Sequence, residues 1–214
     1  MTRAAEEGWV GAEVLAEFPG LGLAFLPVRL GDHRDAATTK ARLAELEDYF
    51  SGPWLTGLAA RPLTAAYRVF YRQVGLDPDA DRTPVERLAL TRLQHGSFAS
   101  RGLLGDALTI AAIETEIPVL ALRGEDVVGP LGLTTARDGE TLGGRPLPAS
   151  TLVVADAARP LAVLFGDDGH PGPHAPRRSD ADVVLYAPIV PGVAPVIAHE
   201  ALWLAAELLG GQES

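Results

Sequence analysis

LLGDALTIAAIETEIPVLAL, residues 103–122, is the stretch in which the sequence changes from helical to extended patterns. Residues 103 to about 115 are apolar on nearly every side, which predicts a helix that is buried on most of its faces. Its polar residues are Asp106, Thr109 and Glu114. Pro118 follows the helical pattern, and short apolar runs of strand length come after it.

A second strong signal lies about twenty residues before this stretch. The segment Thr83-Pro84-Val85-Glu86 combines an N-cap threonine, a proline in the first turn and the glutamate of a capping box. It predicts a helix that starts at Pro84 and ends at Gly96, because glycine readily adopts the left-handed conformation that closes a helix.

The remaining residues before the central stretch alternate between extended and helical patterns. An apolar run over residues 21–30, bounded by glycines, predicts a buried strand. A helix is expected over residues 38–50, with Thr38 or Thr39 as its N-cap, and another over residues 64–74.

After Pro118 the apolar runs are short and are separated by glycine and proline, which is typical of strands joined by turns. The expected strands cover residues 119–122, 131–135, 152–155, 161–165 and 183–187. A last helix is expected over residues 195–209. Helices that come early and strands that come late favour an α+β class over a repeating βαβ array, and no linker divides residues 1–214, so we expect one domain.

Composition narrows the possible functions. The 214 residues include no cysteine, which excludes thiol nucleophiles, zinc–thiolate sites and disulfides. A net charge of −10 argues against electrostatic binding of duplex DNA. The longest uncharged run, residues 183–198, contains three prolines and is too short to span a bilayer. We therefore expect a cytoplasmic protein with no membrane or DNA partner.

Residues 61–101 depart from this acidic balance, with seven arginines and four acidic residues. Arg68 and Arg72 are spaced to lie on one helix face. A stripe of this kind is either a solvated helix face or a contact surface for RNA phosphates. The candidate RNA contacts are Arg68, Arg72, Arg92 and Arg101.

Residues 167–174 gather two carboxylates and two imidazoles in one polar segment. Proline and glycine between His170 and His174 exclude the helical spacing that makes paired histidines a rigid metal site. The segment is expected to be a solvated loop or, alternatively, to line a site, with or without a divalent ion; no residue is assigned as a metal ligand, and no cofactor is expected.

Several segments match, in order and spacing, the motifs of a known family. They are Thr83–Leu88, Gly105–Val119, Ala136–Glu140, Leu152–Asp156, Pro160–Gly166 and Asp182–Leu185. On these residues the chain resembles a free-standing B3/4 domain, the module that carries the editing site in the β subunit of bacterial phenylalanyl-tRNA synthetase. The resemblance implies a compact α+β domain with a β-sandwich-like core flanked by helices. That core would span residues 51–209, with residues 1–50 as an N-terminal strand–helix extension.

The resemblance also implies where a site would lie. Gly105-Asp106-Ala107-Leu108-Thr109 keeps the acid of the family's helix motif and has Thr109 in place of its amide. Thr109 would orient the substrate or a water, His170 would act as the base, and Asp106 would bind an α-ammonium group or brace the helix. A carboxylate on a mostly apolar helix must find hydrogen bonds or lie at the mouth of a pocket, so the alternative is that Asp106 ties down a neighbouring loop. The other expected substrate-binding residues are Glu114, Gly166, Asp167, Gly169 and Tyr186.

Two functions are consistent with these observations. In the first, the protein binds an amino acid or the aminoacyl end of a tRNA, weakly and with salt sensitivity, and hydrolyses misacylated tRNA in trans. In the second, it is a non-catalytic module for a free amino acid, a small metabolite or a protein partner. The hydrolase requires Asp106, Thr109 and residues 166–170 to face one concavity. An Asp106 that is satisfied locally, with Thr109 turned away, favours the binding module.

Overall fold

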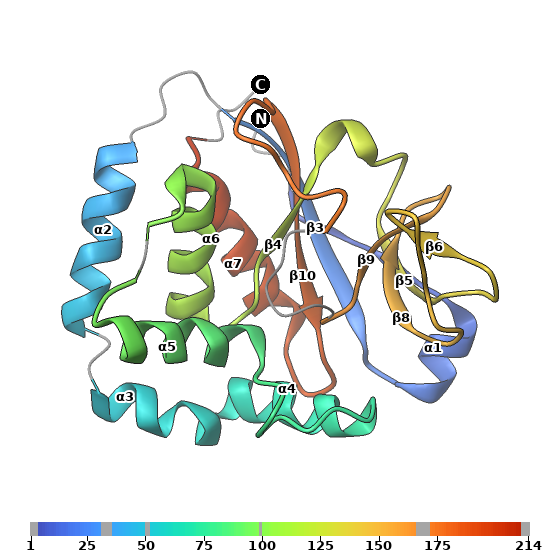
Figure 1. The fold of residues 1–214 in the computed structure, drawn as a ribbon, viewed down its shortest axis with the longest axis horizontal. Helices are drawn as coiled ribbons and strands as arrows, with labels where there is room; N and C mark the ends of the chain where they lie inside the picture. Colours follow the sequence, from blue (N-terminus) through green and yellow to red (C-terminus); the bar gives the residue numbers. More distant parts are fainter. Residues whose placement is uncertain (1–3, 31–35, 50–51, 99, 166–171, 211–214) are drawn as a thin grey trace.

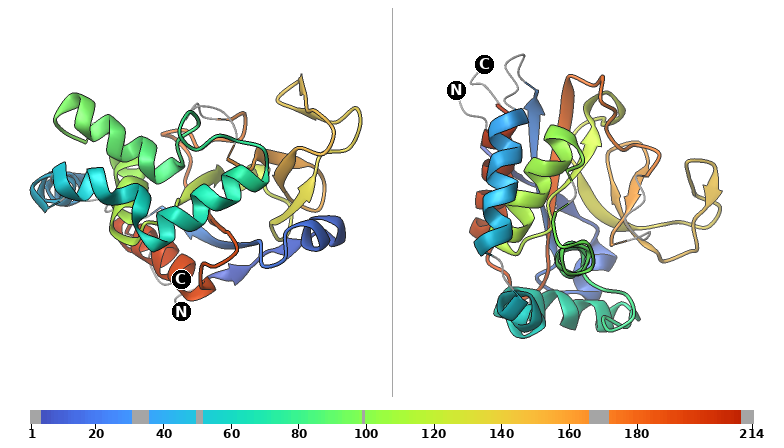
Figure 2. Two further views of the ribbon diagram at one scale, coloured as in Figure 1. Left: turned by 90° about the horizontal axis from the view of Figure 1, so that it is seen from below. Right: turned by 60° about the vertical axis from the view of Figure 1, so that its left-hand side comes forward.

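Three layers make up the molecule: a layer of helices, a first four-stranded sheet and a second four-stranded sheet (Figure 1). The computed structural model describes residues 4–30, 36–49, 52–98, 100–165 and 172–210. Figure 2 shows from two further directions that the helices and the second sheet lie on opposite sides of the first sheet. The predicted class, α+β with a sandwich-like core flanked by helices, is confirmed.

The first sheet is built around a long antiparallel pair. Its strands, in spatial order, are β1 (Glu6–Glu7), β3 (Gly22–Arg29), β10 (Asp182–Ile189) and β4 (Leu120–Arg123). β3 and β10 pair along their whole length, from Gly22 opposite Ile189 to Arg29 opposite Asp182. The N-terminal segment therefore contributes a central strand to the core.

The second sheet is smaller than the first. Its spatial order is β2 (Trp9–Val10), β5 (Gly132–Thr135), β8 (Leu152–Ala155) and β9 (Pro160–Val163). It contains three of the strands expected after Pro118, β5, β8 and β9, whereas the other two are β4 and β10 of the first sheet. β2 pairs with β5 in parallel, and the other pairs are antiparallel. A small hairpin of β6 (Thr141–Leu142) and β7 (Arg145–Pro146) extends from this sheet, and Gly143-Gly144 forms its turn.

All the described helices except α1 (Ala12–Glu17) and η2 (Gly124–Asp126) fall into two groups. In the first group, α7 (Pro195–Leu208) packs directly on β3 and β10 of the first sheet, α6 (Gly102–Thr115) packs on α7, and α2 (Ala36–Tyr49) packs on α6. The second group crosses one end of the layers (Figure 1) and comprises α3 (Gly52–Gly57), η1 (Leu58–Ala60), α4 (Pro62–Gln73) and α5 (Pro84–His95).

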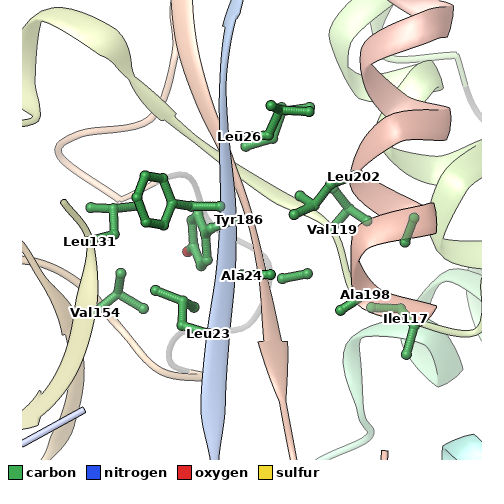
Figure 3. Close-up of a cluster of buried hydrophobic side chains, with 14 of the residues drawn as sticks. Leu23, Ala24, Leu26, Ile117, Val119, Leu131, Val154, Tyr186, Ala198 and Leu202 are labelled. Atoms are coloured by element: carbon green, nitrogen blue, oxygen red, sulfur yellow. The ribbon is translucent and has the colours of Figure 1, made fainter. Parts of the chain in front are cut away.

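The core explains why β3 and β10 are apolar without alternation. Successive residues of a strand point to opposite faces, and both faces of these strands are covered. Leu23 and Tyr186 lie toward Leu131 and Val154 of the second-sheet side (Figure 3). On the opposite face, Ala24 lies toward the helical layer, where Ala198, Leu202 and Ile117 are also buried (Figure 3).

The start of α5 and the end of α4 show how local sequence determines where a helix begins and ends. The predicted capping box is confirmed: the Glu86 amide donates to Thr83 Oγ1 at 3.4 Å, and the Thr83 amide donates to Glu86 Oε2 at 3.1 Å. α4 ends at Gly75, whose φ of 82° is left-handed. There the Leu76 amide donates to the Tyr71 carbonyl at 2.8 Å, closing a Schellman-type cap.

Some boundaries differ from the sequence-based expectation. α2 begins at Ala36, so Thr38 and Thr39 lie inside the helix and are not its N-cap; Thr39 Oγ1 instead donates to the Leu208 carbonyl at 3.4 Å. The strand expected over residues 161–165 ends at Val163, because Phe165 turns into a left-handed conformation. Within the described residues, no helix is long and apolar enough to cross a membrane.

Candidate ligand-binding site

A cavity of about 550 Å³ opens where the ends of several elements meet. Residues from the end of α1, the end of α4 and the first turns of α5 form one part of its lining. The rest comes from β5, from β8 and the residues just before it, from β9 and the residues just after it, and from the segment between α4 and α5. The lining residues on which the site depends are Phe18, Tyr71, Arg87, Ser150, Thr151 and Phe165. A cavity of this size lies within the range of small-molecule sites.

Aromatic rings form one wall of the cavity. Tyr67, Phe70 and Tyr71 occupy one face of α4, because residues three and four apart are neighbours on a helix. Phe165 packs against all three, with ring centroids 6.1, 5.9 and 5.1 Å away, respectively. Phe18 adds an edge-to-face contact with Phe70 at 5.4 Å. Phe18, Tyr71 and Phe165 line the cavity itself, with Tyr67 and Phe70 packed behind them, and this largely apolar wall suits an apolar part of a ligand.

Two residues of the lining have a backbone conformation that side chains seldom adopt. Ser150 and Phe165 have φ values of 65° and 59°. Such residues cost on the order of 1–3 kcal/mol when the region is unfavourable, and they concentrate at functional sites. The only other non-glycine case among the described residues is Glu116, at the end of α6. Backbone strain is therefore concentrated at the cavity.

Tyr71 brings an unsatisfied polar atom to this wall. Its side chain is only 1% exposed, and its hydroxyl has no hydrogen-bond partner in the part of the chain that the structure describes. Burial raises the pKa of Tyr71 above the ordinary value of 10.0, with nearby Arg87 acting in the opposite direction. The group is therefore a neutral phenol at physiological pH, able to donate or accept a hydrogen bond.

Arg87 supplies the cationic group of the cavity. The capping box starts α5 at Pro84, which places Arg87 in the first turns of the helix and on the cavity wall. Its guanidinium makes no ion pair or hydrogen bond with any other described residue, in contrast to neighbouring Arg68. The acidic residues of the lining are Glu17 and Asp81, both exposed. The cavity thus combines one cation and two anions with an aromatic wall.

The structure gives Asp106 the local role that was expected as the alternative, tying down the neighbouring segment, and it gives Thr109 a local role in place of the expected catalytic one. Asp106 is 3% exposed and accepts hydrogen bonds from the Arg101 amide at 2.7 Å and from Ser100 Oγ at 2.6 Å. Thr109 is 5% exposed; its Oγ1 donates to the Gly105 carbonyl at 2.7 Å and accepts from Arg101 Nη2 at 3.0 Å. Neither residue lines the cavity. Together they fix the start of α6.

The other expected substrate-binding residues are dispersed. Glu114 forms a two-pronged ion pair with Arg42 of α2, with N–O distances of 3.1 and 2.8 Å, and so joins two helices away from the cavity. Tyr186 is buried, which raises its pKa, and it lines a second cavity of about 30 Å³ that shares Arg87 and Phe165 with the larger one.

Part of the expected site lies outside the described residues. Gly166, Asp167, Gly169 and His170 all belong to this part of the chain. They follow directly on Leu164 and Phe165, which line the cavity.

His174, the last residue of the polar segment, is held in a cluster of charges. Its Nδ1 lies 3.0 Å from Asp126 Oδ2, and Asp126 also pairs with Arg123 at 3.0 Å. Arg123 pairs in turn with Asp180 at 3.2 Å. The hydrogen bond from His174 and the charge of Arg123 lower the pKa of Asp126. The cluster fastens the segment before β10 to the end of β4.

The candidate RNA-contact arginines do not form a common surface. Arg68 is 8% exposed and is bound by Asp79 and, at 2.7 Å, by Glu86, so the prediction that it lies on a solvated stripe is wrong. Arg92 donates to the Glu47 carbonyl at 3.2 Å, and Arg101 is tied to Thr109. Arg72 is exposed on α4. None of the four lines the cavity.

Sequence reasoning missed Tyr71, Arg87 and Phe165. The available signal was the density of aromatic residues in Tyr67–Tyr71, in a chain in which aromatic residues make up only 6%. Arg87 carries no signal of its own, because its importance lies in the absence of a partner, which only a structure reveals.

Neither a metal site nor a relative gives further guidance. In the described ranges, no group of three or more His, Asp or Glu side chains is placed to hold a metal ion. No family model matches the chain, and no match to a curated protein was found.

Proposed function

We propose that this protein is a binding module for an amino acid with a large apolar side chain, held in the cavity between α4, α5 and the β8–β9 end of the second sheet. The observation that carries the proposal is a cavity that pairs an aromatic wall with buried Tyr71, whose hydroxyl has no partner among the described residues. Ligand pockets combine such apolar walls with a few convergent polar groups.

The internal bonding of Asp106 and Thr109 favours binding without chemistry. Both side chains are occupied by neighbours around the start of α6, so neither is free to orient a substrate or a water. The net charge of −10 and the burial of Arg68 also favour a small ligand over RNA.

Hydrolysis of misacylated tRNA in trans is the second candidate, in line with the resemblance to B3/4 editing domains. One observation supports it: Leu164 and Phe165 line the cavity and directly precede, in the sequence, Gly166–His170, the segment expected to carry the base. Ester hydrolysis needs a positioned water and donors for the oxyanion, and backbone amides of a glycine-containing segment can supply such donors.

Thermal shift with each of the twenty amino acids tests the first candidate, using a variant that fills the cavity. Ala149 is exposed and lines the cavity, so Ala149→Trp places a ring in the opening; Ala158→Trp makes the same change at an exposed turn outside the cavity. A ligand at one hundred times its Kd stabilises the folded state by about 2.7 kcal/mol. For a chain of this length that corresponds to a rise in Tm of roughly 5–10 °C.

We expect wild type and Ala158→Trp to respond to at least one large apolar amino acid and Ala149→Trp to lose the response. A parallel deacylation assay with misacylated tRNAs tests the second candidate. Hydrolysis that Ala149→Trp abolishes and Ala158→Trp retains would replace the binding module with the hydrolase. No thermal response and no hydrolysis would reject both candidates.

A further inference from the structure

The charged residues of the cavity restrict the chemical class of the ligand more than the aromatic residues of the cavity do. Arg87 lines both the 550 Å³ cavity and a smaller cavity of about 30 Å³ that shares part of its lining. Arg87 is half-buried and has no ion-pair partner in the described chain. A guanidinium that is partly removed from water and unpaired is a ready site for a planar oxyanion, which it can bind through two parallel hydrogen bonds.

Other arginines near Arg87 are paired, so an arginine without an ion-pair partner is not the rule around α4 and α5. Arg68 of α4 has Asp79 and Glu86 as partners, and Arg82 lies 3.4 Å from Asp79. Of the carboxylates near Arg87 in sequence, Glu86 and Asp79 are thus already engaged by other cations, and Asp81 is not. Arg87 is left facing the cavity without a paired carboxylate among the described residues.

The acidic residues of the wall decide which oxyanion fits. Glu17 and Asp81 line the same cavity, and neither forms an ion pair within the described residues. One cation beside two carboxylates repels a doubly charged phosphate, because the net charge of the wall is negative. A zwitterion fits this pattern: its carboxylate faces the cation and its ammonium group faces the acids.

We propose that Arg87 binds the α-carboxylate of a free amino acid while Asp81 and Glu17 face its ammonium group, so that the cavity selects free amino acids over their esters and amides. The inference rests on the proposed binding function and extends it to the chemical form of the ligand. The apolar side chain then lies along Phe165 and Tyr71, whose rings line the same cavity.

Isothermal titration with matched ligands tests the inference. The probes are L-phenylalanine and L-leucine, the amide of each, 3-phenylpropanoate and inorganic phosphate. The amides lack the carboxylate charge, and 3-phenylpropanoate lacks the ammonium group. Arg87→Met removes the cation at similar length, and Arg72→Met removes one from exposed α4 outside the cavity. Both variants are expected to fold, because neither guanidinium has a hydrogen bond or ion pair within the described chain.

For wild type and Arg72→Met, we expect the free amino acid to bind about tenfold or more tightly than its amide and than 3-phenylpropanoate, since a hydrogen bond to a charged group is worth that factor. Arg87→Met should bind acid and amide alike. Equal affinity of wild type for acid and amide would overturn the inference and leave the binding function intact. Competition by inorganic phosphate would overturn the selection of zwitterions. Failure of wild type to bind any of the twenty amino acids would remove the proposed function and the inference with it.

Discussion

Replacing Tyr71 by phenylalanine should make the unliganded protein more stable. The tyrosine is 1% exposed and its hydroxyl has no partner within the described chain, so folding strips this group of water without replacing the lost hydrogen bonds. An unsatisfied buried donor costs about 1–3 kcal/mol. Tyr71→Phe removes this cost and keeps the ring that packs on Phe165, so the free energy of unfolding should rise by about 1 kcal/mol.

Tyr67 provides the matched control, one helical turn earlier in the same aromatic cluster. Its hydroxyl donates to the Pro188 carbonyl at 2.6 Å, and its ring is equally buried. Tyr67→Phe should therefore lower the free energy of unfolding by about 1–2 kcal/mol, because it leaves that carbonyl without its partner. The same chemical change is expected to have opposite signs at the two positions.

Urea denaturation at pH 7 measures both variants, with the slope m as a check that the extent of unfolding is unchanged. The corresponding changes in Tm are roughly 2–4 °C per kcal/mol for a chain of this size. A loss of 1 kcal/mol or more in Tyr71→Phe would show that the hydroxyl is already satisfied in the unliganded protein. The argument that it awaits a ligand group would then fail.

Three further predictions concern stability. Thr83→Ala removes the capping box of α5 and should lower the free energy of unfolding by about 1 kcal/mol in urea melts; an unchanged midpoint would contradict the capping role. Burial raises the pKa of Tyr67, Tyr71 and Tyr186 above 10.0, so above that pH the folded state retains protons that the unfolded state loses. The free energy of unfolding should therefore fall as the pH rises above about 10, with ionisation of the tyrosines followed by tyrosinate absorbance. His174 and Arg123 lower the pKa of Asp126 below 3.8, so the stabilisation that the Asp126 carboxylate contributes is present above about pH 4 and is lost on acidification. Asp126→Asn should flatten this part of the curve of unfolding free energy against pH, and an unaltered curve would refute this role of Asp126.

Local patterns in the sequence were sufficient for the long elements. The capping box at Thr83 and the glycine at Gly96 define α5 within one residue, because caps act over a single turn. Strand β8 lies where its apolar run predicts it, and β3 and β10 are recognisable because both of their faces are buried. Short elements such as α1, β1 and β2 escaped prediction, since two to six residues carry too little periodicity to register.

The candidate site was predicted less well, for a physical reason. A polar pair on an apolar helix, Asp106 and Thr109, does require partners, and that part of the reasoning holds. The partners are Ser100, Arg101 and Gly105, which lie close in sequence around the start of α6. The sequence shows that a buried polar group needs hydrogen-bond partners, but it does not identify them. Here the partners are residues close by in the same sequence.

The cavity lies where local rules are broken. A left-handed backbone conformation favours glycine, because glycine adopts it without steric cost. Phe165 nevertheless adopts this conformation, although a glycine, Gly166, is the next residue in the sequence. The conformation is maintained because it directs the Phe165 ring onto Tyr67, Phe70 and Tyr71, and aromatic pairs of this kind each contribute about 0.5–1.5 kcal/mol beyond the area they bury. Three such contacts offset a strained residue. The same ring both closes the core over α4 and forms the wall of the cavity, so packing of the core fixes the shape of the candidate site.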